Sequence, residues 1–186
     1  TPTGVLNANN LWQHSLAVAM TVHSMAQYLP ASSRPAEDDI FLAGLLHDFG
    51  FLVLDYLDPM LSDKFHIRLA GEIEPAAEEI ENDMLGLNHC ELGAELASHW
   101  GLPADIVAVL RYHHCPAQAP AAVLQGQLAQ MIHLAEKLLP TFGTAEQATP
   151  DIAEEIWYAA GINPSCATEL LETAQEHAKH ITPGSD

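Results

Sequence analysis

Residues 40–50, Ile-Phe-Leu-Ala-Gly-Leu-Leu-His-Asp-Phe-Gly, form an apolar segment that closes with an adjacent histidine and aspartate. We expect this segment to end a helix that begins after Pro35, because the acidic residues 37–39 complement the positive end of a helix dipole. Gly50 is expected to cap the carboxyl end of that helix. Neighbouring side chains on a helix point about 100° apart. One metal ion can therefore take the imidazole of His47 while the carboxylate of Asp48 reaches the same ion or a second one.

Proline and glycine divide the rest of the chain into segments whose apolar residues recur at helical spacing, without sustained strand alternation. Asn9 and Asn10 are suited to cap a first helix, from about Leu11 to just before Pro30, that buries Leu11, Val18, Val22 and Met25. Asn88 and Glu91 form a capping box for a helix that stops at Gly101. Further helices are expected in two pieces within 59–84, from Pro103 to His113-His114, and at about 121–139, 151–160 and 165–181. The sequence thus predicts a compact all-α multi-helix domain over residues 1–186.

Composition and charge exclude several classes of protein. The 186 residues are 48% hydrophobic, which excludes a disordered chain and suffices for a single domain. With 25 acidic residues against 6 basic ones and a net charge of −19, nucleic acid and anionic membranes are poor partners. No uncharged apolar run reaches the ~18 residues of a membrane span. The three cysteines lack paired spacing, which favours a reducing cytoplasm. Because the first residue is Thr1, we expect a piece of a longer protein.

Histidines and carboxylates that could bind metal recur on separate predicted helices: His14, His47 with Asp48, His89, His113 with His114, and His133 with Glu136. Helical proteins build metal sites in this way, with facing helices each supplying one or two inward ligands. Imidazoles with one or two carboxylates suit Fe, Mn or Zn better than Ca. Such a site can acidify a bound water and polarise a phosphoryl oxygen, as metal-assisted hydrolysis requires.

The remaining unusual residues are interpreted as structural. Isolated histidines are more often core or surface residues than ligands, and we assign His23, His66, His99, His177 and His180 to that group. Trp12 and Trp100 are expected in the core, and the acidic run at 78–81 is expected to be a solvated face. Cys90 and Cys115 each neighbour a candidate ligand and are expected to be small buried hydrophobes.

Several motifs together resemble the HDOD family of the HD superfamily. They are Leu-Trp-Gln-His-Ser at 11–15, Ala-Gly-Leu-Leu-His-Asp-Phe-Gly at 43–50, and Met-Leu-Gly-Leu-Asn-His-Cys-Glu-Leu-Gly-Ala-Glu-Leu at 84–96. Trp-Gly-Leu-Pro at 100–103, His113-His114 and Ile-His-Leu-Ala-Glu at 132–136 follow in the order and at about the separations of that family. The resemblance covers roughly residues 11–140.

The resemblance implies an all-α fold and a role in bacterial signal transduction, often behind a receiver domain as in response regulators. It also implies metal ligands, since the related HD-GYP enzymes hydrolyse phosphate esters with bound metal. Matched motif by motif, their ligands fall on His14, His47, Asp48, His89, His113 and His114. The last ligand there is an aspartate, for which this chain offers Glu136, with His133 as the alternate.

Three departures from the HD-GYP pattern weigh against cyclic dinucleotide hydrolysis. Phe51 stands where those enzymes have lysine, Asn10 stands for a carboxylate, and no Gly-Tyr-Pro segment follows His114. The favoured hypothesis is a cytoplasmic bacterial regulatory output domain, with a divalent Fe, Mn or Zn site of one or two ions and other signalling domains or proteins as partners. The alternative is a metal-dependent phosphohydrolase of a small phosphoester, with Asp48 orienting the attacking water and Arg111 as the nearby cation.

Overall fold

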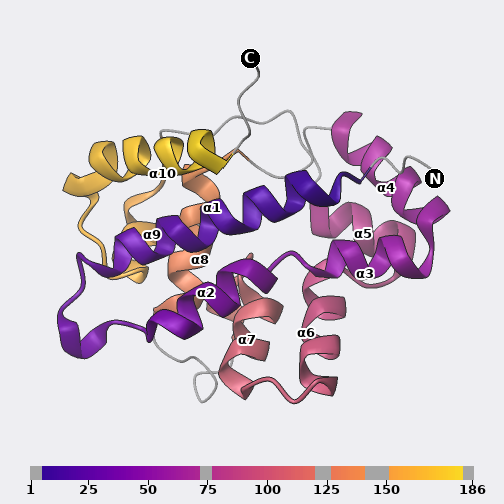
Figure 1. The fold of residues 1–186 in the computed structure, drawn as a ribbon, viewed down its shortest axis with the longest axis horizontal. Helices are drawn as coiled ribbons and strands as arrows, with labels where there is room; N and C mark the ends of the chain where they lie inside the picture. Colours follow the sequence, from indigo (N-terminus) through magenta and orange to yellow (C-terminus); the bar gives the residue numbers. More distant parts are fainter. Residues whose placement is uncertain (1–5, 72–76, 120–126, 141–150, 182–186) are drawn as a thin grey trace.

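The computed structural model describes residues 6–71, 77–119, 127–140 and 151–181, and within these ranges it is helical without strands (Figure 1). The all-α prediction is therefore confirmed. The α-helices are α1 (Ala8–Ala26), α2 (Glu37–Leu46), α3 (Gly50–Leu57), α4 (Pro59–Gly71), α5 (Ala77–Leu85), α6 (His89–His99), α7 (Ala104–Tyr112), α8 (Leu128–Leu138), α9 (Glu154–Ala159) and α10 (Ala167–Ile181). Short 3₁₀ helices lie at Ala31–Ser33, Pro116–Gln118 and Pro164–Cys166.

Helix α1 crosses the molecule and organises the main core. It packs against α2, α8 and α10, and Figure 1 shows it running between α10 and α2. Val18, Val22 and Met25 on its inner face are fully buried, as the apolar spacing predicted. Each such side chain contributes about 1.5–3 kcal/mol on leaving water. A second, smaller apolar cluster joins the start of α1 to α3, α4 and α5. The space between the two clusters is where the polar residues gather.

The His-Asp segment is a turn between two helices, which corrects the prediction for Gly50. Helix α2 ends at Leu46, and α3 begins at Gly50 itself. The backbone N–H of Phe49 donates to the carbonyl oxygen of Leu46 at 3.1 Å, so the chain tightens through residues 47–49. A Cβ atom at Gly50 would lie 2.1 Å from the carbonyl oxygen of His89. Glycine is needed here because α3 meets the start of α6 backbone to backbone, and not because it caps α2.

Residues 37–57, which include this turn, are the one stretch of the described chain long and apolar enough to cross a membrane. The window has a mean hydropathy of 1.6 and is 44% buried in the protein. The turn interrupts it and carries the buried His47 and Asp48. Core helices of globular proteins can be as long and as apolar as a membrane span. The buried polar residues His47 and Asp48 fit a core segment better than a membrane span.

Helix ends and aromatic residues were predicted with mixed success. The side chain of Asn88 accepts from the N–H of Glu91 at 2.9 Å, and Gly101 adopts a positive φ of 76°, so both ends of α6 are confirmed. Helix α1 is capped by Asn7, whose Oδ1 accepts from the N–H groups of Asn9 and Asn10, so those two are not caps. Trp12 and Trp100 were wrongly expected in the core, since they are 54% and 59% exposed. The predicted start of the helix at 121–139 lies outside the described residues.

Candidate metal centre

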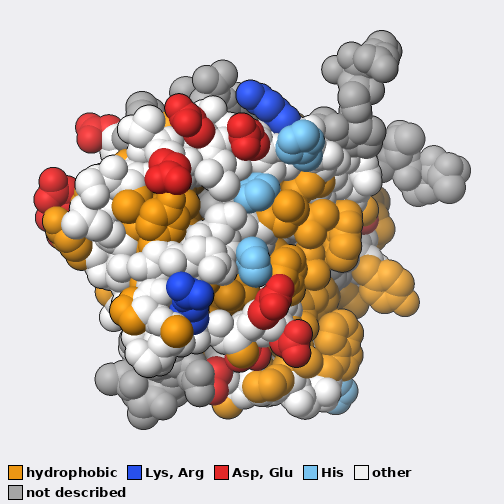
Figure 2. Space-filling view, turned by 60° about the vertical axis from the view of Figure 1, so that its left-hand side comes forward, with side chains coloured by type: hydrophobic (Ala, Val, Ile, Leu, Met, Phe, Trp, Pro, Cys, Tyr) orange, Lys and Arg blue, Asp and Glu red, His pale blue; other side chains and the backbone are white. Residues whose placement is uncertain are grey.

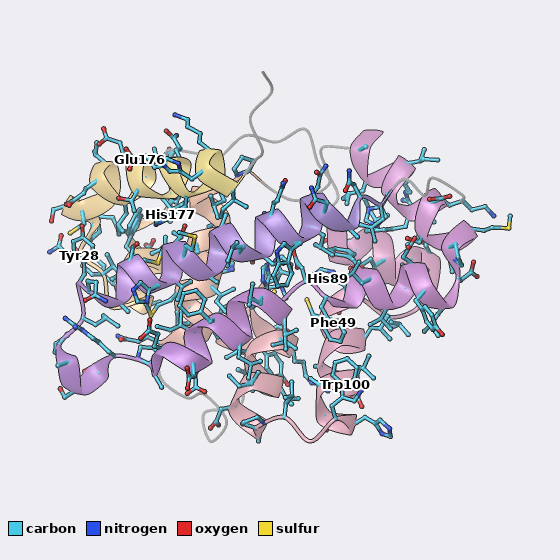
Figure 3. The ribbon with its side chains drawn as sticks, viewed as in Figure 1. Tyr28, Phe49, His89, Trp100, Glu176 and His177 are labelled. Atoms are coloured by element: carbon cyan, nitrogen blue, oxygen red, sulfur yellow. The ribbon has the colours of Figure 1, made fainter. Side chains whose placement is uncertain are left out.

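Seven of the candidate ligands lie together in the interior, and we call them the histidine cluster. It combines His14 of α1, the turn residues His47 and Asp48, His89 at the start of α6, the pair His113 and His114 after α7, and Glu136 of α8. Five segments of the chain thus meet at one place. Figure 3 shows His89 in this interior region, between α1 and the lower helix α6.

Asp48 is the centre of the histidine cluster. Its Oδ2 lies 3.3 Å from Nε2 of His47 and 3.6 Å from Nε2 of His14. Its Oδ1 lies 3.4 Å from Nε2 of His89 and 3.6 Å from Nε2 of His113. Glu136 forms a second acidic point, 3.5 Å from Nε2 of His47 and 3.6 Å from Nδ1 of His114. Each carboxylate therefore faces two or more imidazoles.

The rings of three histidines are held by hydrogen bonds from the opposite nitrogen. Nδ1 of His47 lies 2.7 Å from the carbonyl oxygen of Gly44, and Nδ1 of His113 lies 2.8 Å from that of Leu110. A carbonyl oxygen only accepts, so in both rings Nδ1 carries a hydrogen, and Nε2, which faces Asp48, is the nitrogen that would bind a metal ion after losing its proton. Nδ1 of His89 is bound in the same way, 2.6 Å from Oε2 of Glu81. This arrangement is the one that fixes and orients metal-bound imidazoles in proteins.

Several buried polar atoms of the histidine cluster make no hydrogen bond. His47 and His113 are fully buried and Asp48 is 2% exposed. Nε2 of His47, Oδ1 of Asp48 and Oε2 of Glu136 nevertheless lack a hydrogen-bond partner. Each such atom costs about 1–3 kcal/mol when nothing satisfies it. Metal ions bound in the cluster would satisfy these atoms, because its donor atoms form groups in which all lie within 4.8 Å of one another. The cluster can therefore hold a metal ion.

The pKa values of the cluster depend on two opposing effects, burial, which favours the neutral form of each side chain, and the neighbouring charges, which favour the ionised form. Burial raises the pKa of Asp48, but the charge of His47 and the close contacts of His113 and His47 lower it by more, so the pKa lies well below its usual value. Burial lowers the pKa of His47, but the charges of Asp48 and Glu136 have the larger effect and raise this pKa from the ordinary 6.5 to about 9. Burial lowers the pKa of His114 to about 3. Burial raises the pKa of Glu136, but His114 and His113 lower it by more, so both carboxylates are kept ionised, which is the state that binds metal.

Two residues predicted near the site lie elsewhere. Nδ1 of His133 lies 3.0 Å from the backbone carbonyl of His113, so His133 supports that segment while Glu136 occupies the cluster. Arg111 pairs with Glu95 of α6, an exposed carboxylate, and forms no ion pair with Asp48 or Glu136 among those found in the described residues. The structure therefore does not bring Arg111 into the histidine cluster.

One neighbour of the cluster, Glu81, was missed from sequence, and the contacts of two others, Phe51 and Cys90, were not foreseen. Glu81 is 1% exposed and accepts from both the backbone N–H and the ring of His89, so it is not part of a solvated face. Phe51 stacks on the ring of His89 with centroids 4.1 Å apart and a 21° interplanar angle. Cys90 is buried, as predicted, but its Sγ lies 3.4 Å from Nε2 of His89; Cys115 is exposed, against prediction. The sequence held one signal for the burial of Glu81. Gly86 and Asn88 indicate that the chain reverses between α5 and α6, which can bring Glu81 back to His89.

A family model described as the HDOD domain matches residues 1–116, more than half of the chain. The chain belongs to the HDOD family. The match covers His14, His47, Asp48, His89, His113 and His114 and ends before α8, which supplies Glu136. The histidine cluster is thus built mainly, but not wholly, from the HDOD region.

Relatives of this HDOD chain confirm the fold. An uncharacterised protein of Treponema pallidum is 34% identical over 83 residues, 44% of this chain and 16% of its own length. An HDOD protein of unknown function from Geobacter sulfurreducens superposes with a TM-score of 0.76 at 22% identity, covering 96% of this chain and 63% of that one. A Marinobacter aquaeolei protein assigned to signal transduction gives 0.75 at 24% identity, covering 97% and 38%. This HDOD chain spans less than two thirds of each.

Proposed function

We propose that this chain is a regulatory output domain of bacterial signal transduction whose histidine cluster holds one or two divalent transition metal ions. Membership of the HDOD family and the likeness to the Marinobacter protein support the regulatory role. The observation that carries the metal is Asp48, a buried carboxylate facing four imidazole Nε2 atoms at 3.3–3.6 Å. An imidazole-rich set with two carboxylates favours Fe, Mn or Zn.

The distribution of donor atoms around Asp48 supports two ions. Its Oδ2 faces His14 and His47, and its Oδ1 faces His89 and His113. Two donor groups share Asp48 and Glu136, one with His14 and His47 and the other with His113 and His114. Asp48 and Glu136 would then serve both ions, one held with His14 and His47 and the other with His113 and His114. Metal bound here would supply an acidified water and a Lewis acid for a phosphoryl oxygen.

The surroundings of the cluster favour regulation over hydrolysis. An anionic phosphoester needs positive charge, and Phe51 places an apolar ring against His89 on one side of the cluster. Arg111, the cation expected from sequence, is paired with Glu95. The side chains of His14, His114 and Glu136 are 10%, 26% and 14% exposed, so only this edge meets solvent. On the face of the molecule shown in Figure 2, acidic side chains are more frequent than Lys and Arg.

The alternative function is hydrolysis of a small phosphoester. The cluster has enough donors for two ions, which is the observation in its favour. In that case Asp48 would hold the attacking water between the ions, while His14 and His114 at the exposed edge would face the substrate. Metal alone would then have to neutralise the phosphate.

Metal content and hydrolysis together test this function. The protein is purified without chelator or metal-affinity tag, and its metal is measured by mass spectrometry alongside Asp48→Asn. We expect at least one equivalent of Fe, Mn or Zn per chain in the wild type. We also expect turnover of p-nitrophenyl and bis-p-nitrophenyl phosphate to equal that of the variant. No metal after reconstitution would overturn the metal centre, and turnover abolished by Asp48→Asn would establish the alternative.

We further propose that the domain works in the bacterial cytoplasm and contacts other signalling domains or proteins, and that it binds neither nucleic acid nor membranes. The net charge of −19 supports the exclusions, because it repels phosphate backbones and anionic lipids. At low salt, where such binding is strongest, we expect no retention on DNA or on phosphatidylserine vesicles. Retention on either would contradict the proposal.

A further inference from the structure

Cys90 lies inside the histidine cluster but takes no part in the function proposed above. It is the second residue of α6 and is 3% exposed. Its Sγ lies 3.4 Å from Nε2 of His89 and 3.9 Å from Nε2 of His113. Nε2 of His114 lies 3.1 Å from the same Nε2 atom of His89. These four side chains form a donor group whose atoms all lie within 4.8 Å of one another.

Three separations among the four donors are close to the edges of a metal tetrahedron. With Zn–N bonds of about 2.0–2.1 Å and Zn–S bonds of about 2.3 Å, neighbouring donors lie roughly 3.3 Å apart for two nitrogens and roughly 3.6 Å apart for nitrogen and sulfur. The observed nitrogen–nitrogen separation is 3.1 Å, and the two sulfur–nitrogen separations are 3.4 and 3.9 Å. Small shifts on binding would bring each to the tetrahedral value.

The direction of the lone pairs supports a cation at this point. His89 and His113 are bound through Nδ1 to Glu81 and to the carbonyl of Leu110, so their Nε2 atoms turn towards the sulfur. Oδ1 of Asp48, buried and without a hydrogen bond, points at the same two nitrogens from 3.4 and 3.6 Å. An ion bound among the sulfur and the imidazole nitrogens would therefore lie next to Oδ1 of Asp48, which could reach it as a further ligand.

We propose that Cys90 is a thiolate ligand of the ion held by His89, His113 and His114. This inference rests on the proposed metal centre and deepens it. A sulfur ligand would make the donor group beside α6, with His89 and Cys90, chemically different from the group beside α1, with His14 and His47. A His₃Cys donor set is softer than imidazole with carboxylate and favours zinc over manganese or magnesium. On binding, the thiol gives its proton to solvent and the sulfur lone pair forms the bond to the ion.

Cobalt substitution makes the sulfur ligand visible. The full chain is stripped of metal, loaded with Co²⁺ and examined by absorption spectroscopy together with Cys90→Ser and the matched control Cys166→Ser. Cys166 lies in the 3₁₀ helix at Pro164–Cys166, outside the donor groups of the histidine cluster. We expect a near-ultraviolet sulfur-to-cobalt charge-transfer band in the wild type and in Cys166→Ser, and none in Cys90→Ser.

The outcomes separate this inference from the function on which it rests. Cobalt that binds with ligand-field bands but without a charge-transfer band would overturn the Cys90 ligand and leave the metal centre standing. Absence of any bound cobalt or zinc would overturn both. If Cys90→Ser fails to fold, X-ray absorption of the zinc-loaded wild type decides: a sulfur neighbour at about 2.3 Å supports the ligand, and a shell of nitrogen and oxygen alone overturns it.

Discussion

Glu81 holds His89 by two hydrogen bonds: its Oε2 lies 2.6 Å from Nδ1 of the ring, and its Oε1 accepts from the backbone N–H at 3.0 Å. Both residues are almost fully buried. One carboxylate thus fixes the orientation of the imidazole and also satisfies a free N–H at the start of α6. This pair of hydrogen bonds connects α5 to the histidine cluster. Through it Glu81, a residue outside the cluster, fixes the position of the His89 ring.

Replacing this carboxylate should weaken metal binding without removing a ligand. For Glu81→Gln we expect a loss of about 10–100-fold in metal affinity, the usual cost of disturbing the partner of a metal-bound histidine. Competition with a chromophoric chelator measures it. The matched control is Glu79→Gln on the same helix, where the side chain is exposed. Equal affinities for the two variants would show that Glu81 serves only the fold.

Asp48→Asn should abolish the stabilisation that metal gives. An ion at 100 times its dissociation constant adds about 2.7 kcal/mol to the free energy of unfolding. At this chain length that corresponds to roughly 5–10 °C in Tm. We expect chelator to lower the Tm of the wild type by such an amount and to leave that of Asp48→Asn unchanged. Scanning calorimetry with and without chelator gives both numbers, and a wild type indifferent to chelator would contradict a filled site.

His66 should make the metal-free protein sensitive to mild acid. Burial lowers its pKa from the ordinary 6.5 to about 4, although Asp55 and Asp63 oppose this. The folded state therefore binds fewer protons than the unfolded state between these values. Stability is complete above pH 6.5 and falls as the pH drops towards 4, by at most about 3 kcal/mol. In urea unfolding at a series of pH values, His66→Gln should show a shallower decline than the wild type. Parallel curves would assign the acid sensitivity to other groups.

Gly50→Ala should damage the molecule at the contact of α3 with α6. The added Cβ would meet the backbone of His89 at 2.1 Å, and backbone cannot move aside as a flexible side chain would. We expect a loss of about 1–3 kcal/mol or more in the free energy of unfolding and weaker metal binding, because His89 must shift. Gly71→Ala is the control, since no atom lies within 4 Å of its Cβ position. A Gly50→Ala protein as stable as the control would show that the two helices can separate freely.

The sequence was sufficient to assemble the histidine cluster but not its supports. Six of the seven residues were singled out by their places near helix ends and by the resemblance to HD-GYP motifs. Glu136 was left open against His133, and only the packing of α8 distinguishes the two. Glu81 sits in an acidic run that looks solvated, and its burial depends on how α5 folds back over the start of α6. Arg111 was placed by closeness in sequence to His113, whereas the helix turns its side chain to Glu95.

Fold prediction failed where a contact between segments decided the outcome. Gly50 has the sequence features of a helix cap, and only the approach of His89 reveals its role. Trp12 and Trp100 are large and apolar, yet they lie on outward faces of α1 and at the end of α6. Asn7, Asn9 and Asn10 are equally good caps by composition, so the choice of Asn7 depends on where the packed part of α1 begins.

The ligands of the histidine cluster are spread along the chain from residue 14 to residue 136, on segments that become neighbours only when the helices have packed. An unfolded or half-folded chain therefore offers no comparable site, and a metal ion would bind only late in folding. Its binding energy would then stabilise the native state and not the transition state, so we expect metal to slow unfolding and to leave the folding rate almost unchanged. The metal-bound domain would then be more stable than the metal-free domain chiefly because it unfolds more slowly.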